Sequence, residues 1–117
     1  MRSTLIAATA LLAGFATAKT IDVQVGQSGS NSFSPSSITA AKGDQVVFHL
    51  LSTFHDVAQG DLKSPCKPLA SGFYSGYPKK DGDSTFTVTI NGTDPIYLYC
   101  STNGHCQQGM VGAINAP

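Results

Sequence analysis

The segment Ile96–Asn115 reads IYLYCSTNGHCQQGMVGAIN, in which two strand-like runs enclose a loop of potential metal ligands. The first run, Ile96–Cys100, has the β-branched and aromatic residues that favour a strand, and Val111–Asn115 is predicted to form the last strand. The loop offers a thiolate, an imidazole and a thioether in turn, at Cys100, His105 and Met110. A glycine precedes each of the last two, which frees the backbone where the loop must bend sharply. If the loop turns back over the end of the strands, all three side chains reach one point.

This set of donor atoms predicts a copper site. Soft thiolate and thioether ligands select copper, and one Cys, two His and a weak axial Met form the site of electron-transfer copper proteins. The second histidine must come from elsewhere, and the remaining candidates are His49 and His55. His49 lies inside the strand-like run Gln45–Leu51, where we expect a hydrogen-bonded structural role. His55 follows the end of that run, so we predict it as the fourth ligand.

Residues 1–18 have the order of a secretory signal peptide. Arg2 precedes an apolar stretch from Leu5 to Ala13, and the small residues Ala16-Thr17-Ala18 form a cleavage site. We therefore expect cleavage after Ala18 and an extracellular, secreted product. No later stretch approaches the roughly 18 apolar residues of a membrane span, and Asn115-Ala116-Pro117 at the end lack the hydrophobic tail that directs a lipid anchor. The expected product is soluble and released.

Zinc is the alternative to copper, because the sequence offers four zinc ligands at His55, Cys100, His105 and Cys106. Two observations oppose this set. Cys106 adjoins His105, so both side chains would have to converge from neighbouring positions, and Cys66 would remain unpaired in an oxidising compartment. A disulfide between Cys66 and Cys106 removes both problems and leaves one free thiol for the metal. Such a disulfide would stabilise the fold by roughly 4 kcal/mol.

Composition limits the domain count and the class of partner. The 117 residues suffice for one domain, which we place at residues 19–117. Only 12% of the residues are charged, seven Lys and Arg balance seven Asp and Glu, and no run of like charge occurs. This composition argues against nucleic acid or anionic lipid as a partner. We expect a monomer with a redox partner that the sequence does not identify.

Short strand-like segments separated by turn signals run through the rest of the chain. Residue type and alternation predict strands at Thr20–Val25, Gln45–Leu51 and Ser84–Ile90, with an irregular edge strand from Phe33 to Ala41. The stretch Gly60–Gly82, with three Pro and four Gly, predicts a long loop. No convincing helix pattern is present. The expected fold is all-β, a Greek-key antiparallel β-sandwich.

Asn91-Gly92-Thr93 combines a turn signal with an acceptor sequence for N-glycosylation. Because it separates the predicted strands Ser84–Ile90 and Ile96–Cys100, we expect a hairpin turn there. An exposed turn would give the glycosylation enzyme access to Asn91. Asn-Gly also serves turn geometry alone, so the sequence leaves both uses open.

Taken together, these residues make the chain similar to the cupredoxins, and within them to the phytocyanins and the cupredoxin-like extracellular proteins of fungi. The phytocyanin pattern Cys-x4-His-x4-Met, with a second Cys directly after the His, is present from Cys100 to Met110. The strand motif GD-x-V-x-F, which precedes the first ligand, is present from Gly43 to Phe48. The segment from Pro65 to Tyr77 resembles the fungal branch, and the resemblance covers residues 19–117.

One departure from the family pattern carries an expectation about the copper potential. Phytocyanins often have Asn after the first His, where it helps to hold the loop beside the thiolate, and this chain has Asp56. A carboxylate near the copper thiolate favours the oxidised, more positive ion. We therefore expect a lower reduction potential than in relatives.

The resemblance implies a blue-copper protein with one copper ion in a type 1 site, and its ligands would be His55, Cys100, His105 and Met110. Four protein ligands leave no open position for a substrate, so we do not expect an enzyme. The predicted role is electron transfer through His105 on the exposed loop. Two alternatives remain open. Extracellular copper buffering or delivery would use the same ligands, and a metal-free host-facing or wall-facing interaction module would use none of them.

Overall fold

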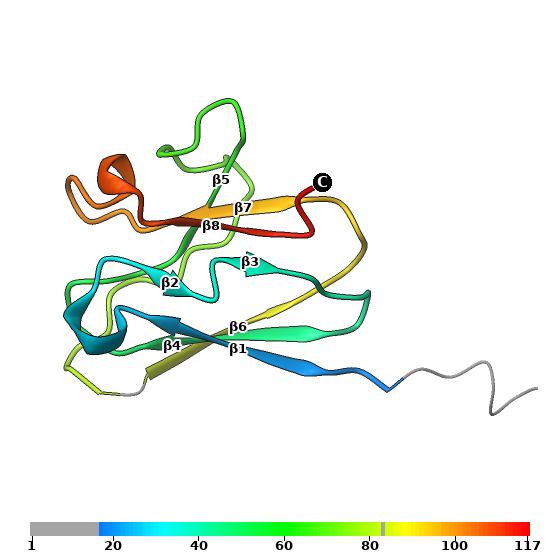
Figure 1. Ribbon diagram of the computed structural model, residues 1–117, viewed down its shortest axis with the longest axis horizontal. Coiled ribbons are helices and arrows are strands. Elements are labelled where there is room, and N and C mark those ends of the chain that lie inside the picture. Colours follow the sequence, from blue (N-terminus) through cyan, green and yellow to red (C-terminus); the bar gives the residue numbers. More distant parts are fainter. Residues whose placement is uncertain (1–16, 83) are drawn as a thin grey trace, which may run out of the picture.

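The computed structural model describes residues 17–82 and 84–117, which form a β-sandwich (Figure 1). Within these residues, two four-stranded sheets have the orders β2-β1-β4-β6 and β3-β8-β7-β5. The first sheet consists of β1 (Thr20–Val25), β2 (Phe33–Ser34), β4 (Gln45–Leu50) and β6 (Ser84–Thr89). The second consists of β3 (Ser37–Ile38), β5 (Ala58–Gly60), β7 (Ile96–Tyr99) and β8 (Val111–Ile114). Two short 3-10 helices lie in the connections, η1 (Gln27–Gly29) and η2 (Cys106–Gln108).

Alternation of side chains explains how the sheets enclose one core. Along β4, every second residue is buried, and β1 and β7 send Val23 and Leu98 into the same core cluster. Phe48 lies near the centre of β4, where its ring packs against those of Phe73 and Phe86, with centroid distances of 6.4 and 6.5 Å. Burying one such ring stabilises a fold by about 1.5–3 kcal/mol. The predicted all-β sandwich is confirmed.

Both sheets are mixed, whereas the sequence predicts antiparallel strands. β1 lies parallel to β4, and β3 lies parallel to β8, while the remaining pairs are antiparallel. A parallel neighbour needs a crossover connection. Here the chain leaves β1, passes through β2 and β3, and re-enters the first sheet at β4. Alternation of residues reports which face of a strand is buried, and it carries no information about strand direction.

The predicted hairpin turn at Asn91-Gly92 is wrong. β6 pairs with β4 in the first sheet, and β7 pairs with β5 and β8 in the second. The connection between β6 and β7 therefore crosses from one sheet to the other. Asn91 is exposed in this connection, and its glycosylation stays a prediction.

The predicted signal peptide, residues 1–18, lies outside the described residues except for Thr17 and Ala18. In the part of the chain that the structure describes, no helix has the length and apolar character needed to cross a membrane.

Candidate metal centre

The predicted ligands come from connections at one end of the sandwich, at the left in Figure 1. His55 lies between β4 and β5, and Cys100 directly follows β7. His105 caps the start of η2, and Met110 directly precedes β8. Gly104 has a φ angle of 84° and the glycine before Met110 has one of 108°, so both adopt the left-handed backbone that suits glycine.

Three of these residues form a compact cluster of donor atoms. The Cys100 Sγ lies 4.0 Å from the Nδ1 of His55 and 3.7 Å from the Nδ1 of His105. Among the described residues these three side chains form a group whose ligand atoms all lie within 4.8 Å of one another. Cys100 is fully buried, His55 is 4% exposed and His105 is partly exposed. The cluster thus has one edge open to solvent.

The fourth predicted ligand is tied to this cluster through the backbone. The Met110 N–H donates to the His105 carbonyl at 3.0 Å, and the Met110 carbonyl accepts from the Cys100 N–H at 3.2 Å. The side chain of Met110 is fully buried and belongs to the same core cluster as Cys100. The loop between β7 and β8 therefore closes on itself at the candidate metal centre.

The spacing of the donor atoms fits a bound transition metal. A metal ion about 2.0–2.3 Å from a sulfur and a nitrogen, with a bond angle of about 120°, would hold those atoms roughly 3.8 Å apart. The observed separations of 4.0 and 3.7 Å agree with that value. One thiolate and two imidazoles are also the donor set that suits copper.

Gly26 supports His55 from the opposite side, a contact that the sequence did not indicate. A Cβ atom at Gly26 would lie only 2.3 Å from the Cδ2 of His55 and 2.9 Å from its Nε2. Gly26 also has a φ angle of +81°. The imidazole therefore packs against a backbone that has no side chain, and nothing larger than glycine fits.

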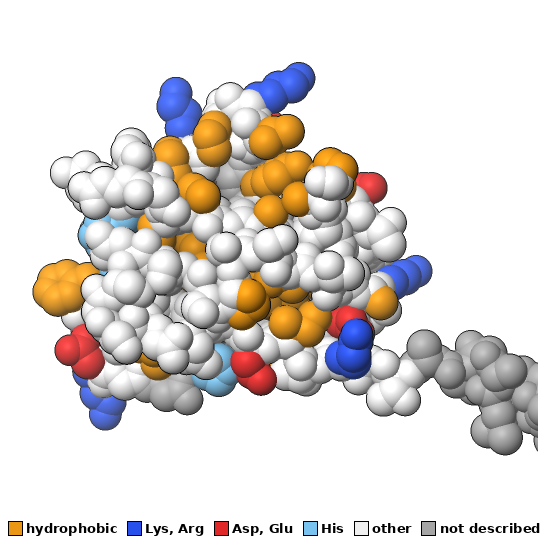
Figure 2. All heavy atoms as spheres, viewed as in Figure 1, with side chains coloured by type: hydrophobic (Ala, Val, Ile, Leu, Met, Phe, Trp, Pro, Cys, Tyr) orange, Lys and Arg blue, Asp and Glu red, His pale blue; other side chains and the backbone are white. Residues whose placement is uncertain are grey.

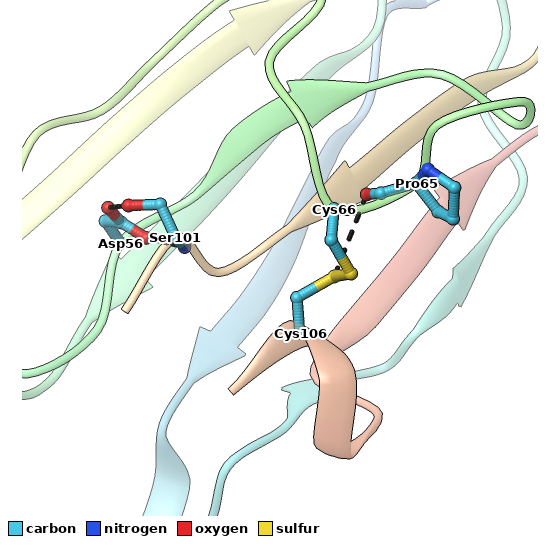
Figure 3. The surroundings of a disulfide bond; sticks show 5 residues. All are labelled: Asp56, Pro65, Cys66, Ser101 and Cys106. Atoms are coloured by element: carbon cyan, nitrogen blue, oxygen red, sulfur yellow. Dashed lines mark hydrogen bonds between the residues drawn. A yellow bond between two sulfur atoms is a disulfide. The ribbon is translucent and has the colours of Figure 1, made fainter. Parts of the chain in front are cut away.

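Asp56 joins three segments around the cluster. Its fully buried carboxylate accepts the Ser101 N–H at 2.7 Å, the Ser101 hydroxyl and the Tyr74 hydroxyl at 2.9 Å. Figure 3 shows Asp56 and Ser101 facing each other. Since Asp56 follows His55 and Ser101 follows Cys100, these bonds fix two predicted ligands relative to each other. The sequence indicated Asp56 but gave no sign of Tyr74 as its partner.

Burial favours the uncharged forms of Cys100 and His55. Desolvation raises the pKa of the Cys100 thiol, although hydrogen bonds from Thr102 and from the backbone of Asp56 act in the opposite direction. Desolvation also lowers the pKa of His55, and the neighbouring His105 lowers it further. A metal ion would therefore replace the thiol proton of Cys100 and meet a neutral imidazole at His55.

The structure contains a disulfide between Cys66 and Cys106, as the sequence predicted (Figure 3). It links the long loop after β5 to η2 across a sequence separation of 40 residues. Cys100 is the free cysteine among the described residues. Cys106 is thereby removed from the set of available ligands, so the alternative zinc site with Cys106 does not form.

His49 has the structural role predicted for it. Its Nε2 lies 2.8 Å from the Asp22 Oδ1 on the neighbouring strand β1. The two residues stand on adjacent strands of the first sheet, because Asp22 pairs with Val47 and Gln24 pairs with His49. His49 does not belong to the cluster of donor atoms found in the described part of the chain.

Comparison with known proteins shows the family to which the chain belongs. No family model matches the sequence. A probable GPI-anchored cupredoxin-1 of the fungus Arthroderma benhamiae is 46% identical over 112 residues, which cover 96% of this chain and 59% of that protein. The chain belongs to the cupredoxin family. An extracellular serine-rich protein of the same fungus is 46% identical to this cupredoxin over 110 residues, which cover 91% of the chain and 43% of the relative.

The solved structures agree on the fold. Spinach plantacyanin superposes with a TM-score of 0.58 at 20% identity, and the match covers 84% of this chain and 99% of that one. An auracyanin from Roseiflexus castenholzii has a TM-score of 0.61 at 17% identity, over 87% of this cupredoxin and all of that chain. The chain spans about half the length of the two curated relatives that it matches.

Proposed function

We propose that this cupredoxin is a secreted type 1 copper protein that transfers electrons. Its ligands would be the two imidazoles, the thiolate and the thioether of the metal centre, at His55, His105, Cys100 and Met110. The observation that carries the proposal is the cluster of one buried sulfur and two imidazole nitrogens within 4.8 Å. Bound copper would supply one-electron chemistry, and the protein would supply a fixed, buried cage.

The burial of each residue supports separate tasks within that cage. Cys100 and Met110 are fully buried, so they would shield the centre from water and competing ligands. His105 is partly exposed on the loop and would be the route by which electrons leave. Asp56 holds the two sides of the centre together through Ser101. A rigid cage lowers the rearrangement that accompanies each electron, and no group in this set is placed to transform a substrate.

Secretion is supported by the signal-like residues 1–18 and by the disulfide, which persists in oxidising compartments. The fungal relatives bear the names GPI-anchored and extracellular, so a cell-surface location is an equally testable form of the same proposal. Copper buffering remains the second candidate, because it would use the same buried ligands.

Addition of copper to the purified protein tests the metal assignment. The loaded protein should be blue, because a thiolate bound to Cu(II) absorbs strongly in the visible range, and Cys100→Ser should remove the colour. Cys100 is fully buried, so folding of the variant is checked by circular dichroism. A colourless protein, or one that binds zinc more tightly than copper, would overturn the proposal. Copper that is bound but cannot be cycled between its oxidation states would favour buffering over electron transfer.

A further inference from the structure

A cavity of about 560 Å³ opens between the long loop after β5 and the loop that follows β7. Its volume lies within the range of small-molecule sites in proteins. The lining comes from β5, the long loop, β7 and the segment from Cys100 to Gln107. Cys100 is one of these residues but is fully buried, and most of the lining has no part in the proposed metal centre.

One side of the cavity is apolar and held in place. It includes Leu69, Phe73, Tyr74 and Tyr99. The Phe73 ring packs in the core against Phe48 and Phe86, with centroids 6.4 and 5.8 Å away. The Tyr74 hydroxyl is bonded to Asp56. These contacts fix two aromatic rings of the wall, and fixed aromatic rings suit the flat face of an aromatic ligand.

The rest of the lining includes solvent-exposed amide groups that are available to a ligand. Asn103 and Gln107 line the cavity, and no other described residue engages their side-chain amides. An amide presents both donors and an acceptor, as a hydroxyl group of a ligand does. Two free amides beside an aromatic wall therefore match a molecule that combines a ring with a hydroxyl group.

Tyr99 adds a hydroxyl group to the residues that line the cavity. It is only 4% exposed, and its hydroxyl has no hydrogen-bond partner among the described residues. Every fully enclosed side-chain nitrogen or oxygen in the described part of the chain has a partner. The Tyr99 hydroxyl is therefore not fully enclosed, and Tyr99 is one of the residues that line the cavity. A ligand hydroxyl would satisfy this group.

The charge and rigidity of the cavity further limit the class of ligand that it can bind. None of the described residues that line the cavity is Asp, Glu, Lys, Arg or His, so a charged ligand would enter without a counter-charge and lose its hydration. Cys66 and Cys106 both line the cavity, and their disulfide joins its two sides covalently. A site held open in this way needs little ordering when a ligand binds.

We propose that this cavity binds small, neutral aromatic molecules that carry a hydroxyl group. The inference goes beyond the proposed function, because binding requires no metal. A bound molecule would lie beside the loop that follows Cys100, next to the centre that we propose for electron transfer.

The proposal is tested on the metal-free protein by fluorescence titration with 2-naphthol. The chain has no Trp, so the probe can be excited without protein background. We expect saturable binding of one molecule. Two analogues should each bind at least about tenfold more weakly than 2-naphthol. Naphthalene-2-sulfonate has the same ring with a negative charge, and decahydro-2-naphthol has the hydroxyl group without aromaticity. Equal binding of either analogue, or no saturable binding, would overturn the proposal.

Two leucines of the long loop provide a matched pair of variants. Leu69 lines the cavity and is 36% exposed, whereas Leu62 is 66% exposed and lies outside it. Leu69→Ala should weaken 2-naphthol binding about tenfold, and Leu62→Ala should leave it unchanged. Replacement of both Asn103 and Gln107 by Ala should abolish the preference for 2-naphthol over naphthalene. Equal losses in the two leucine variants would contradict the assignment to this cavity. Because the metal is absent from these titrations, their failure is distinct from a failure of copper binding.

Discussion

His55 is positioned by contact with a backbone that has no side chain. Gly26 follows β1, in a part of the fold far from the other predicted ligands in sequence. A Cβ atom there would overlap the imidazole, since the nearest ring atom would lie 2.3 Å away. The connection that follows β1 thereby takes part in the proposed metal centre, although all four proposed ligands lie in other connections.

Gly26→Ala should displace His55 and weaken copper binding while the fold persists. Gly29→Ala is the matched control, because Gly29 also has a positive φ angle but no atom lies within 4 Å of its Cβ position. Both variants should lose roughly 1–2 kcal/mol of stability from backbone strain. Only Gly26→Ala should change the visible spectrum of the copper-loaded protein and lower its copper affinity. Identical spectra for the two variants would show that Gly26 has no role in positioning the ligand.

Asp56→Asn should raise the reduction potential of the copper-loaded protein. The substitution removes a negative charge beside the thiolate, and that charge favours the oxidised ion. An interaction of about 1–2 kcal/mol corresponds to a shift on the order of 50–100 mV for a one-electron couple. Voltammetry measures the shift, and Asp22→Asn on β1 serves as a control at a site that pairs with His49. A fall in potential, or equal shifts in both variants, would contradict this role.

The predicted ligands were accessible from sequence because they share a short stretch with strict spacing. Cys100, His105 and Met110 lie on one loop, and the residue type of each determines its donor atom. The residues that hold the ligands in place could not be predicted from sequence. Tyr74 meets Asp56 across 18 positions, and Gly26 looked like any turn glycine. Such contacts arise from packing between connections, which a local pattern does not encode.

At the level of elements, Asp44 pins the start of β4 to the segment before β1. Its buried carboxylate accepts the backbone N–H groups of Lys19 and Ala41, each at 2.9 Å. These two bonds lower the pKa of Asp44, with the Lys19 bond as the larger cause. The ionised form therefore stabilises the folded state above the pKa of the unfolded chain, and this contribution is lost as the pH falls through the folded-state pKa.

Asp44→Asn should reduce the loss of stability on acidification. The amide cannot titrate, so the difference in unfolding free energy between neutral pH and about pH 2 should shrink relative to the wild type. Denaturant titration at both pH values measures it. Asp94→Asn, exposed in the connection between β6 and β7, should leave the difference as in the wild type. An unchanged acid dependence in Asp44→Asn would contradict the stabilising role of the carboxylate.

The disulfide should matter more for stability than for the metal. Replacement of Cys66 and Cys106 together by Ala should lower the free energy of unfolding by about 4 kcal/mol, the chain-entropy value for a separation of 40 residues. The double replacement leaves no extra thiol that could bind copper. The visible spectrum should change little, because neither cysteine belongs to the donor cluster. Loss of the visible absorption together with wild-type stability would contradict this prediction.

The longer strands followed from sequence, since β1, β4 and β6 alternate over six residues each. β5 was missed because its three residues, Ala58–Gly60, are too few to show a period. The pairing of strands was also beyond reach. Whether the chain after Ile90 folds back as a hairpin or crosses to the other sheet depends on which faces need cover, a property of the whole sandwich.

At the scale of the molecule, charge is sparse and balanced, with a formal net charge of zero. Figure 2 shows the charged side chains of one face scattered, mostly near its edges, with no large patch of one sign. Electron exchange with a small redox partner should therefore vary by no more than about twofold with salt, since there is little long-range field to screen. Stopped-flow rates measured with hexacyanoferrate at low and high ionic strength test this expectation.

Asn103→Arg is the matched control for the salt experiment. It adds one positive charge to the exposed loop beside His105. Exchange with anionic hexacyanoferrate should then become salt-dependent, while the copper spectrum stays unchanged. A steep salt dependence already in the wild type would mean that the exposed loop is not the docking site.

The contact between Lys19 and Asp44 has a consequence for how the protein matures. The donor is the Lys19 backbone nitrogen, 2.9 Å from the carboxylate. If the signal peptide is cleaved after Ala18, as the sequence predicts, that nitrogen becomes a free α-ammonium group. A neutral hydrogen bond is thereby converted into an ion pair with a buried carboxylate, and charge-assisted bonds are roughly twice as strong. Removal of the signal peptide would therefore strengthen this contact only on export. Recombinant protein with one extra N-terminal residue would lack the ion pair.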